Sequence, residues 1–277
     1  MKYVEFSINP TTEFKEQAPI YKDILTADLA EIGFESFVEE NNIFKAYALE
    51  ENFEKSTLNF DYLHGKLYEV KPVIEQNWNE EWEKNYPAIV VEDRCIIRAD
   101  FHEKPAGIEY DLLIVPKMSF GTGHHETTYL MTSFLMDEDV KNKSVLDMGC
   151  GTAILAILAH KKEATYVEAI DIDDWAYENT LENCALNGAE SIVCKLGDAS
   201  LLGDVKYDVI LANINRNILL ADMPAYSDVL NTGGTIFFSG FYETDVPKIE
   251  ERANEVGFTL IDKKVKNHWT SLKMKKQ

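Results

Sequence analysis

Two acidic residues on either side of a glycine-rich turn are the residues of this chain best suited to hold a nucleoside. The segment Val145–Ala153 reads VLDMGCGTA, so an apolar stretch ends in Asp147 and the glycines Gly149 and Gly151 follow. A second apolar stretch ends in Asp171. Glycine lets a ligand approach bare backbone, and an acid at the end of the second strand of a βαβ unit binds ribose hydroxyls. We therefore predict a crevice with Asp147 beside it and Asp171 on a ribose hydroxyl.

The residues around this turn also favour one kind of nucleoside. A dinucleotide fingerprint, G-x-G-x-x-G, would need a third glycine where this chain has Ile154, and Asp147 would repel a pyrophosphate. S-adenosylmethionine has no phosphate and carries an ammonium group, which an acid attracts. The sequence thus predicts S-adenosylmethionine as the cofactor and disfavours NAD. No metal is expected, because the adjacent His124 and His125 diverge and no third ligand has a suitable spacing.

Strands and helices that alternate from Val145 onward must position these residues. This alternation predicts a doubly wound, mostly parallel sheet with helices on both faces, and the tail predicts an antiparallel hairpin at the sheet edge. The expected elements are strands 145–147, 165–170, 191–196, 207–212 and 234–239, helices 152–162, 175–187, 216–230 and 245–256, and the hairpin 258–266 with 269–274. Two β-rich segments, 88–99 and 109–115, and a helix over 129–136 precede them.

The first third of the chain predicts a small α+β domain. A strand over 3–8, a helix over 13–32, a hairpin of strands 34–39 and 43–49, a helix over 52–63 and a strand over 67–74 give the order βαββαβ, which is typical of ferredoxin-like folds. We expect this domain at residues 1–75, a linker helix at 76–88 and a methyltransferase domain at 89–277. The linker carries Trp78 and Trp82 four residues apart, a face that either docks on a domain or binds a partner.

The composition of the chain indicates its kind of partner and its location in the cell. The net charge is −21, and residues 1–88 hold 8 Lys, no Arg and 18 acidic residues, which repels nucleic acids and attracts basic partners. The 4 cysteines form no C-x-x-C pair, so a disulfide framework is not indicated. There is no apolar run of about 18 residues and no signal-peptide core at the start. We expect a cytoplasmic protein that does not contact membranes.

A second motif lies upstream of the glycine turn and narrows the family. Residues 120–128 read FGTGHHETT, directly before an apolar helix, and Ala212-Asn213-Ile214 follows a later strand. With the glycine turn and the acid at 171, these motifs resemble the class I methyltransferases that act on the eleventh protein of the large ribosomal subunit. The likeness is strong from Phe120 to the C terminus and rests on predicted topology before it. The chain has Ala153 where class I enzymes have a further glycine.

The resemblance implies both a reaction and a site. The enzyme would methylate lysine side chains and the N-terminal amine of that basic ribosomal protein, which the N-terminal domain would grasp, without recognising nucleic acid directly. Asn213 would face the methyl group and orient the amine, and Asp198 would accept a hydrogen bond from the adenine amino group. The implied cofactor-binding residues are Phe120, Gly121, Thr128, Asp147, Gly149, Gly151, Asp171, Asp198 and Asn213.

The residues after Asn213 bear on the methyl acceptor. Adenine and glutamine methyltransferases carry Asn-Pro-Pro-Tyr there, but this chain has Asn-Ile-Asn-Arg, which argues against a planar amide or base nitrogen. An amine must lose its proton to attack, which at pH 7 costs about 4.6 kcal/mol for lysine and about 1 kcal/mol for an α-amine. Partial burial would lower the lysine pKa. A small-molecule methyltransferase and a noncatalytic binding protein remain open as alternatives.

Overall fold

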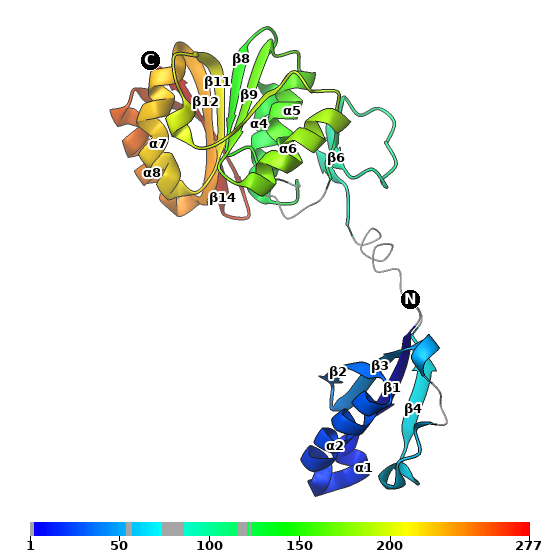
Figure 1. Cartoon of the computed structure of the whole chain (residues 1–277). Helices are drawn as coiled ribbons and strands as arrows, with labels where there is room; N and C mark the ends of the chain where they lie inside the picture. Colours follow the sequence, from blue (N-terminus) through cyan, green and yellow to red (C-terminus); the bar gives the residue numbers. More distant parts are fainter. Residues whose placement is uncertain (1–2, 54–56, 74–85, 116–120, 122) are drawn as a thin grey trace. The chain divides into compact units, whose positions relative to one another are not determined.

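The chain divides into two compact units, Met1–Asn85 and Tyr86–Gln277. The computed structural model (Figure 1) describes residues 3–53, 57–73, 86–115, 121 and 123–277. The predicted linker helix at 76–88 lies outside these residues, apart from its last three. No helix within the described ranges combines the length and apolar character that crossing a membrane requires.

The first unit is built on a four-stranded antiparallel sheet with the order β2-β3-β1-β4. This is the ferredoxin-like order that the sequence predicts. The turn between β2 and β3 is formed by Asn41 and Asn42, which have φ values of 51° and 64°, as a tight hairpin turn requires. The strands are β1 (Tyr3–Ile8), β2 (Phe34–Glu40), β3 (Ile43–Leu49) and β4 (Tyr68–Pro72).

The first predicted helix is broken in two. Helix α1 (Pro10–Phe14) and the 3₁₀ turn η1 (Lys15–Gln17) precede α2 (Ala18–Glu31). Proline has no N–H to donate and is tolerated only in the first turn of a helix, so Pro19 must begin a new helix. The single helix expected over 13–32 is therefore wrong at this point.

The second predicted helix, over 52–63, is also wrong in its described part. The described residues of this range lie in 3₁₀ turns, among them η2 (Glu50–Asn52) and η4 (Asp61–Leu63), or in irregular structure, and none is in an α-helix. Phe60 stacks on Tyr62 with 5.6 Å between the ring centroids, and Phe53 packs edge-on against Phe34. Aromatic residues two apart that pack together do not fit the 3.6-residue period of a helix.

The second unit contains a seven-stranded sheet with the order β10-β9-β8-β11-β12-β14-β13. The first five strands are parallel, and β14 pairs antiparallel with both β12 and β13. The predicted parallel sheet with an antiparallel edge hairpin is confirmed. The strands are β8 (Ser144–Met148), β9 (Tyr166–Asp171), β10 (Val193–Leu196), β11 (Tyr207–Asn213), β12 (Leu230–Tyr242), β13 (Phe258–Lys266) and β14 (Trp269–Lys276).

Helices cover both faces of this sheet (Figure 1), with α7 and α8 on one face and α4, α5 and α6 on the other. Alternate residues of the central strands enter the two cores: Val145 packs with α5, and Leu146 packs on the α7 side. The helices are α4 (Glu126–Asp137), α5 (Ile154–Lys161), α6 (Asp174–Leu186), α7 (Arg216–Val229) and α8 (Val246–Glu255), with 3₁₀ turns η5 (Ala199–Leu201) and η6 (Glu243–Asp245).

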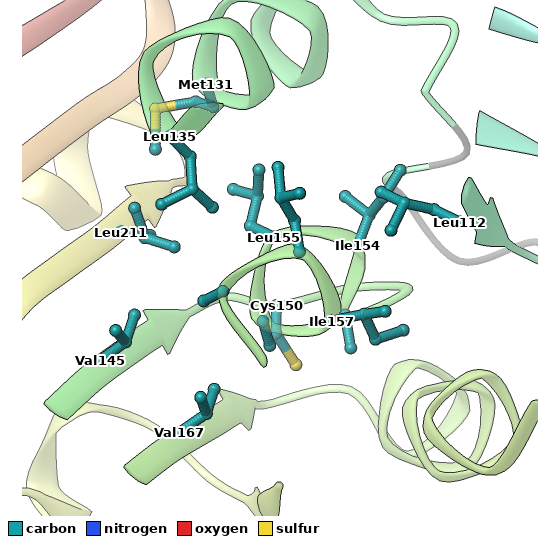
Figure 2. Close-up of a cluster of buried hydrophobic side chains, with 14 of the residues drawn as sticks. Leu112, Met131, Leu135, Val145, Cys150, Ile154, Leu155, Ile157, Val167 and Leu211 are labelled. Atoms are coloured by element: carbon teal, nitrogen blue, oxygen red, sulfur yellow. The ribbon is translucent and has the colours of Figure 1, made fainter. Parts of the chain in front are cut away.

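Helix α5 directly follows the glycine turn and anchors it in the hydrophobic core. Six of its eight residues are buried, and Figure 2 shows Ile154 and Leu155 between Leu112 and the α4 side chains Met131 and Leu135. A helix this apolar must be enclosed by its neighbours. The turn before α5 is therefore held in place by the core.

A small sheet with the order β5-β6-β7 completes the second unit. Its strands are β5 (Ile89–Val91), β6 (Cys95–Arg98) and β7 (Tyr110–Leu113), within the two predicted β-rich segments. Arg98 and Asp111 form an ion pair of 2.7 Å between β6 and β7. This sheet packs against α4 and α5 in the same hydrophobic core.

Candidate active site

A cavity of about 420 Å³ opens at the carboxyl ends of β8, β9 and β11. Strand β8 lies between β9 and β11, so the strand order reverses here, which is where open α/β sheets bind ligands. The walls come from the glycine turn, from the ends of the three strands, from α7 and from β14. The lining residues are His125, Thr127, Met148, Gly149, Gly151, Asp171, Ile172, Gly197, Asp198, Asn213, Ile214, Asn215, Ile218, Asp222, Gly240 and Trp269.

The glycine turn is shaped by close backbone contacts. Gly149 has a φ of 70°, and a Cβ atom there would lie 2.0 Å from Cγ2 of Ile214. The amides of Gly149 and Cys150 both donate to the carbonyl of Ile170, at 2.8 and 3.1 Å. Ala153 has a φ of 62°, a left-handed conformation that suits glycine best. A glycine could adopt this conformation without the strain that the Ala153 side chain brings.

Asp171 ends β9 and supports the turn from the neighbouring strand. Its Oδ2 accepts a hydrogen bond of 2.8 Å from the Gly151 amide, and its Oδ1 accepts one of 3.0 Å from the Asp173 amide. A carboxylate has about four acceptor positions, so it retains capacity for hydroxyl donors in the cavity. The side chain lies at the cavity wall where a ribose was expected.

Asp147 lies below the turn and does not line the cavity, so the expectation that it stands at the crevice needs correction. It is 1% exposed, and its Oδ2 accepts a hydrogen bond of 3.0 Å from the Ala156 amide in the first turn of α5. Burial raises its pKa to about 7. The carboxyl group thus caps a buried helix end, a contact that sequence spacing alone did not reveal.

The buried position of Asp147 predicts a pH-dependent stability. The folded state holds the Asp147 proton more tightly than the unfolded chain, so this contribution is present below about pH 4 and is lost as the pH rises to about 7. Asp147→Asn keeps an acceptor for Ala156 without the ionisation. The stability of the variant relative to wild type should rise between pH 4.5 and pH 7.5, by up to about 3 kcal/mol. Urea unfolding of both proteins at the two pH values measures this difference in stability. If the difference between variant and wild type is the same at both pH values, the raised pKa of Asp147 is wrong.

Two predicted site residues carry buried polar atoms that have no hydrogen-bond partner in the described part of the chain. These atoms are Oδ1 of Asn213, at the end of β11, and Oγ1 of Thr128, in the first turn of α4. Asn213 lines the cavity, while Thr128 is 1% exposed and does not. A buried acceptor without a donor is costly, so the Asn213 carbonyl is suited to receive a donor from a ligand.

The remaining predicted residues lie at different distances from the cavity. Gly151 and Asp198 line it, and Asp198 also caps η5 by accepting a hydrogen bond from the Ser200 amide. Gly121 does not line it, but its carbonyl accepts a hydrogen bond of 2.7 Å from the hydroxyl of Thr152 beside the turn. Phe120 lies outside the described residues.

Several wall residues were missed by the sequence analysis. Trp269 at the start of β14 packs against His125 and Tyr242, with ring centroids 4.5 and 4.1 Å apart. Ile172, directly after Asp171, is 72% exposed, and Ile218 on α7 is 51% exposed. Ile172 could have been predicted as a wall residue, because it directly follows Asp171, which was expected at the cavity. Trp269 is distant in sequence, and the predicted edge hairpin did not by itself show that the start of its second strand reaches the cavity.

The donor set suits an organic cofactor. Among the residues that the structure describes, no group of three or more His, Cys, Asp or Glu side chains could hold a metal ion. The cavity offers instead an acid at the end of β9, an open backbone turn and exposed apolar side chains. These groups fit a nucleoside whose ribose contacts Asp171 and which lies against the backbone of Gly149.

Comparison with known proteins points the same way. Residues 8–277 match the model of the family described as ribosomal protein L11 methyltransferase (PrmA). A relative of that name from Phocaeicola vulgatus is 47% identical over 283 residues, covering 99% of both chains, and one from Chlorobaculum parvum is 30% identical over 93% of both chains. The crystal structure of a ribosomal protein L11 methylase from Lactobacillus delbrueckii subsp. bulgaricus has a TM-score of 0.65 and 32% identity. It covers 69% of this chain and 100% of its own.

Proposed function

Because the chain belongs to the ribosomal protein L11 methyltransferase family, we propose that it transfers methyl groups from S-adenosylmethionine to amino groups of ribosomal protein L11. Lysine side chains and the N-terminal amine of that protein are the acceptors that we propose. The observation that carries the proposal is the unpartnered Asn213 carbonyl oxygen at a cavity that also contains the Asp171 carboxylate. Both side chains come from strand ends on either side of the switch point.

The chain's part in the reaction is mainly alignment. The bound cofactor supplies a methyl group on a sulfonium, already activated for displacement. Asp171 would hold the ribose and Gly149 would accept the cofactor against its backbone, so the position of the methyl group is fixed from β8 and β9. Asn213 would accept a hydrogen bond from the attacking amine and direct its lone pair along the line of displacement.

The acceptor must be neutral when it attacks. The cavity wall nearest the start of β14 is aromatic and largely apolar, which favours the neutral form of a lysine side chain and lowers its pKa. In the described part of the chain, no lysine or arginine side chain is among the cavity's lining residues. The Asn213 carbonyl can accept a hydrogen bond from an amine. Because an amide is not basic, it does not take up the proton that the amine must lose before it attacks.

Trp269 is positioned to contact the acceptor side chain in this proposal. Its indole ring lines the cavity between His125 and Tyr242, and the stem of a lysine packs well on such a surface. Trp269→Ala should raise KM for L11 about tenfold while the Kd for S-adenosylmethionine changes less than about threefold. Trp269→Phe, which keeps a ring, is the matched control. Steady-state kinetics with both variants measure this, and an unchanged KM for L11 in the alanine variant would exclude the contact.

The N-terminal unit is proposed to hold the protein substrate. Residues 1–88 carry 8 Lys, no Arg and 18 acidic residues, a charge that attracts a basic ribosomal protein and opposes direct binding of nucleic acid. A cytoplasmic location, where ribosomal proteins are made, follows from this role. Membranes have no part in it.

One incubation tests the proposal as a whole. Purified protein, ribosomal proteins of the large subunit and S-adenosylmethionine labelled in its methyl group are combined, and the labelled products are separated by mass. Label in L11 alone is the expected result, and peptide mapping should place it on lysines and on the N-terminal amine. Label only in small molecules would support the alternative of a small-molecule methyltransferase, while no binding of the cofactor would support a noncatalytic role.

A further inference from the structure

Ile214, which directly follows Asn213, is held between two glycines that come from different parts of the sheet. On one side its Cγ2 atom occupies the space that a Cβ atom of Gly149 would need. On the other side, a Cβ atom at Gly240 would lie 2.2 Å from the carbonyl oxygen of Ile214 and 2.7 Å from its carbonyl carbon. Carbon atoms in contact lie about 3.5–4.0 Å apart. Neither glycine can therefore gain a side chain while Ile214 stays where it is.

Gly240 reaches Ile214 because it lies in a bulge of β12. The pairing of β12 with β14 shifts its register between Ser239 and Phe241, which leaves Gly240 as the extra residue. Its φ of 97° is a conformation that suits glycine. In the parallel pairing of β12 with β11, Ser239 lies opposite Asn213. The bulge therefore begins directly beside Asn213.

The loop between β11 and α7 is also fixed at its far end. Oδ1 of Asn215 caps α7 by accepting a hydrogen bond of 2.9 Å from the Asn217 amide. The carbonyl oxygen of the Asn213 side chain differs, because no donor in the described part of the chain holds it. Its position therefore depends on the backbone of the loop, which the cap and the two glycine contacts fix.

We propose that the bulge at Gly240 positions Asn213 for methyl transfer: it leaves room for the Ile214 backbone and so places the Asn213 carbonyl where the attacking amine needs it. Gly240 lines the cavity but has no side chain to offer, so it acts through Asn213. The inference rests on the proposed function, since it concerns the acceptor end of the same reaction. Alignment of this kind is sensitive, because a displacement of about 1 Å can lower a rate about 100-fold.

Gly240→Ala tests the proposal. The Ile214 carbonyl must move by about 1 Å to make room for the new methyl group, so kcat for L11 methylation should fall at least tenfold. The Kd for S-adenosylhomocysteine should change less than about threefold. The matched control is Gly233→Ala in the same strand. Gly233 has a φ of 76°, but a Cβ atom there would meet nothing within 4 Å, so this control adds backbone strain without the contact and should keep the wild-type kcat.

A double variant shows whether Gly240 acts through Asn213. In the Asn213→Ala background, Gly240→Ala should lower kcat by less than about twofold, since the group that it positions is already absent. Losses that multiply in the double variant would mean a purely structural role and would overturn the proposal. A wild-type kcat in Gly240→Ala alone would overturn it too, while the proposed function would stand.

Ile214→Ala decides the matter if Gly240→Ala does not fold. This variant removes the Cγ2 atom that lies against Gly149 and adds no atom, so the loop loses one of its contacts without a clash. We expect kcat to fall about tenfold with little change in the Kd for S-adenosylhomocysteine, and an unchanged kcat would overturn the proposal. If the wild type itself does not methylate L11, the proposed function fails, and this inference fails with it.

Discussion

Replacing Asn213 with alanine is expected to lower kcat for L11 methylation about 100-fold while the Kd for S-adenosylmethionine changes less than about threefold. The Asn213 carbonyl oxygen is buried and has no donor among the described residues, so its removal breaks no hydrogen bond of the folded chain. What is lost is the group that we propose orients the attacking amine. Single-turnover methylation and cofactor titration on the same preparation measure both quantities.

A matched substitution makes the Asn213 result specific. Asn254 is exposed on α8, outside the cavity, so Asn254→Ala should leave kcat unchanged. If Asn213→Ala retains the wild-type kcat, the placement of this side chain beside the methyl group is wrong. If kcat and cofactor affinity fall by the same factor, Asn213 binds the cofactor and does not orient the acceptor.

Removing residues 1–75 is expected to reduce kcat/KM for L11 at least 100-fold and to leave the Kd for S-adenosylmethionine within about threefold of wild type. Among the residues that the structure describes, those lining the cavity all lie at His125 or later, and those of the first unit's core all belong to that unit. The shortened chain would therefore keep the cofactor site and lose the surface that we propose holds the substrate. Cofactor titration and L11 methylation by the shortened chain provide the two values.

The cofactor titration also serves as the control for folding in that experiment. A shortened chain that binds the cofactor has an intact second unit, so any loss of L11 methylation belongs to the missing residues. Methylation of L11 by this chain at the wild-type kcat/KM would contradict the substrate-holding role of the first unit. The second unit alone would then recognise the ribosomal protein.

Local sequence signals predicted most of the second unit because its strands and helices alternate and its strand ends carry the polar residues. Asp171 and Asn213 lie at the ends of β9 and β11 as expected, since parallel strands bring their carboxyl ends to one edge. The failures have local physical causes. Pro19 cannot continue the helix before it, and the aromatic pairs around Phe60 replace a helical period with side-chain stacking.

Within the site, the part that could not be predicted depends on how the elements pack, either just after the glycine turn or far along the sequence. Asp147 was expected at the crevice because it directly precedes the glycines. In the structure its carboxyl group instead accepts a hydrogen bond from a free amide in the first turn of α5, and the side chain is buried under the glycine turn. The walls formed by Asp222 and Trp269 depend on where α7 and β14 pack. No motif around the glycine turn contains that information.

A crystal structure of the protein with bound S-adenosylhomocysteine would test the proposed cofactor site most directly. We expect the ribose hydroxyls within hydrogen-bonding distance of the Asp171 carboxylate, the nucleoside against Gly149, and the sulfur facing the Asn213 side chain. Density for the compound at another site, or none at this cavity under saturating conditions, would contradict it.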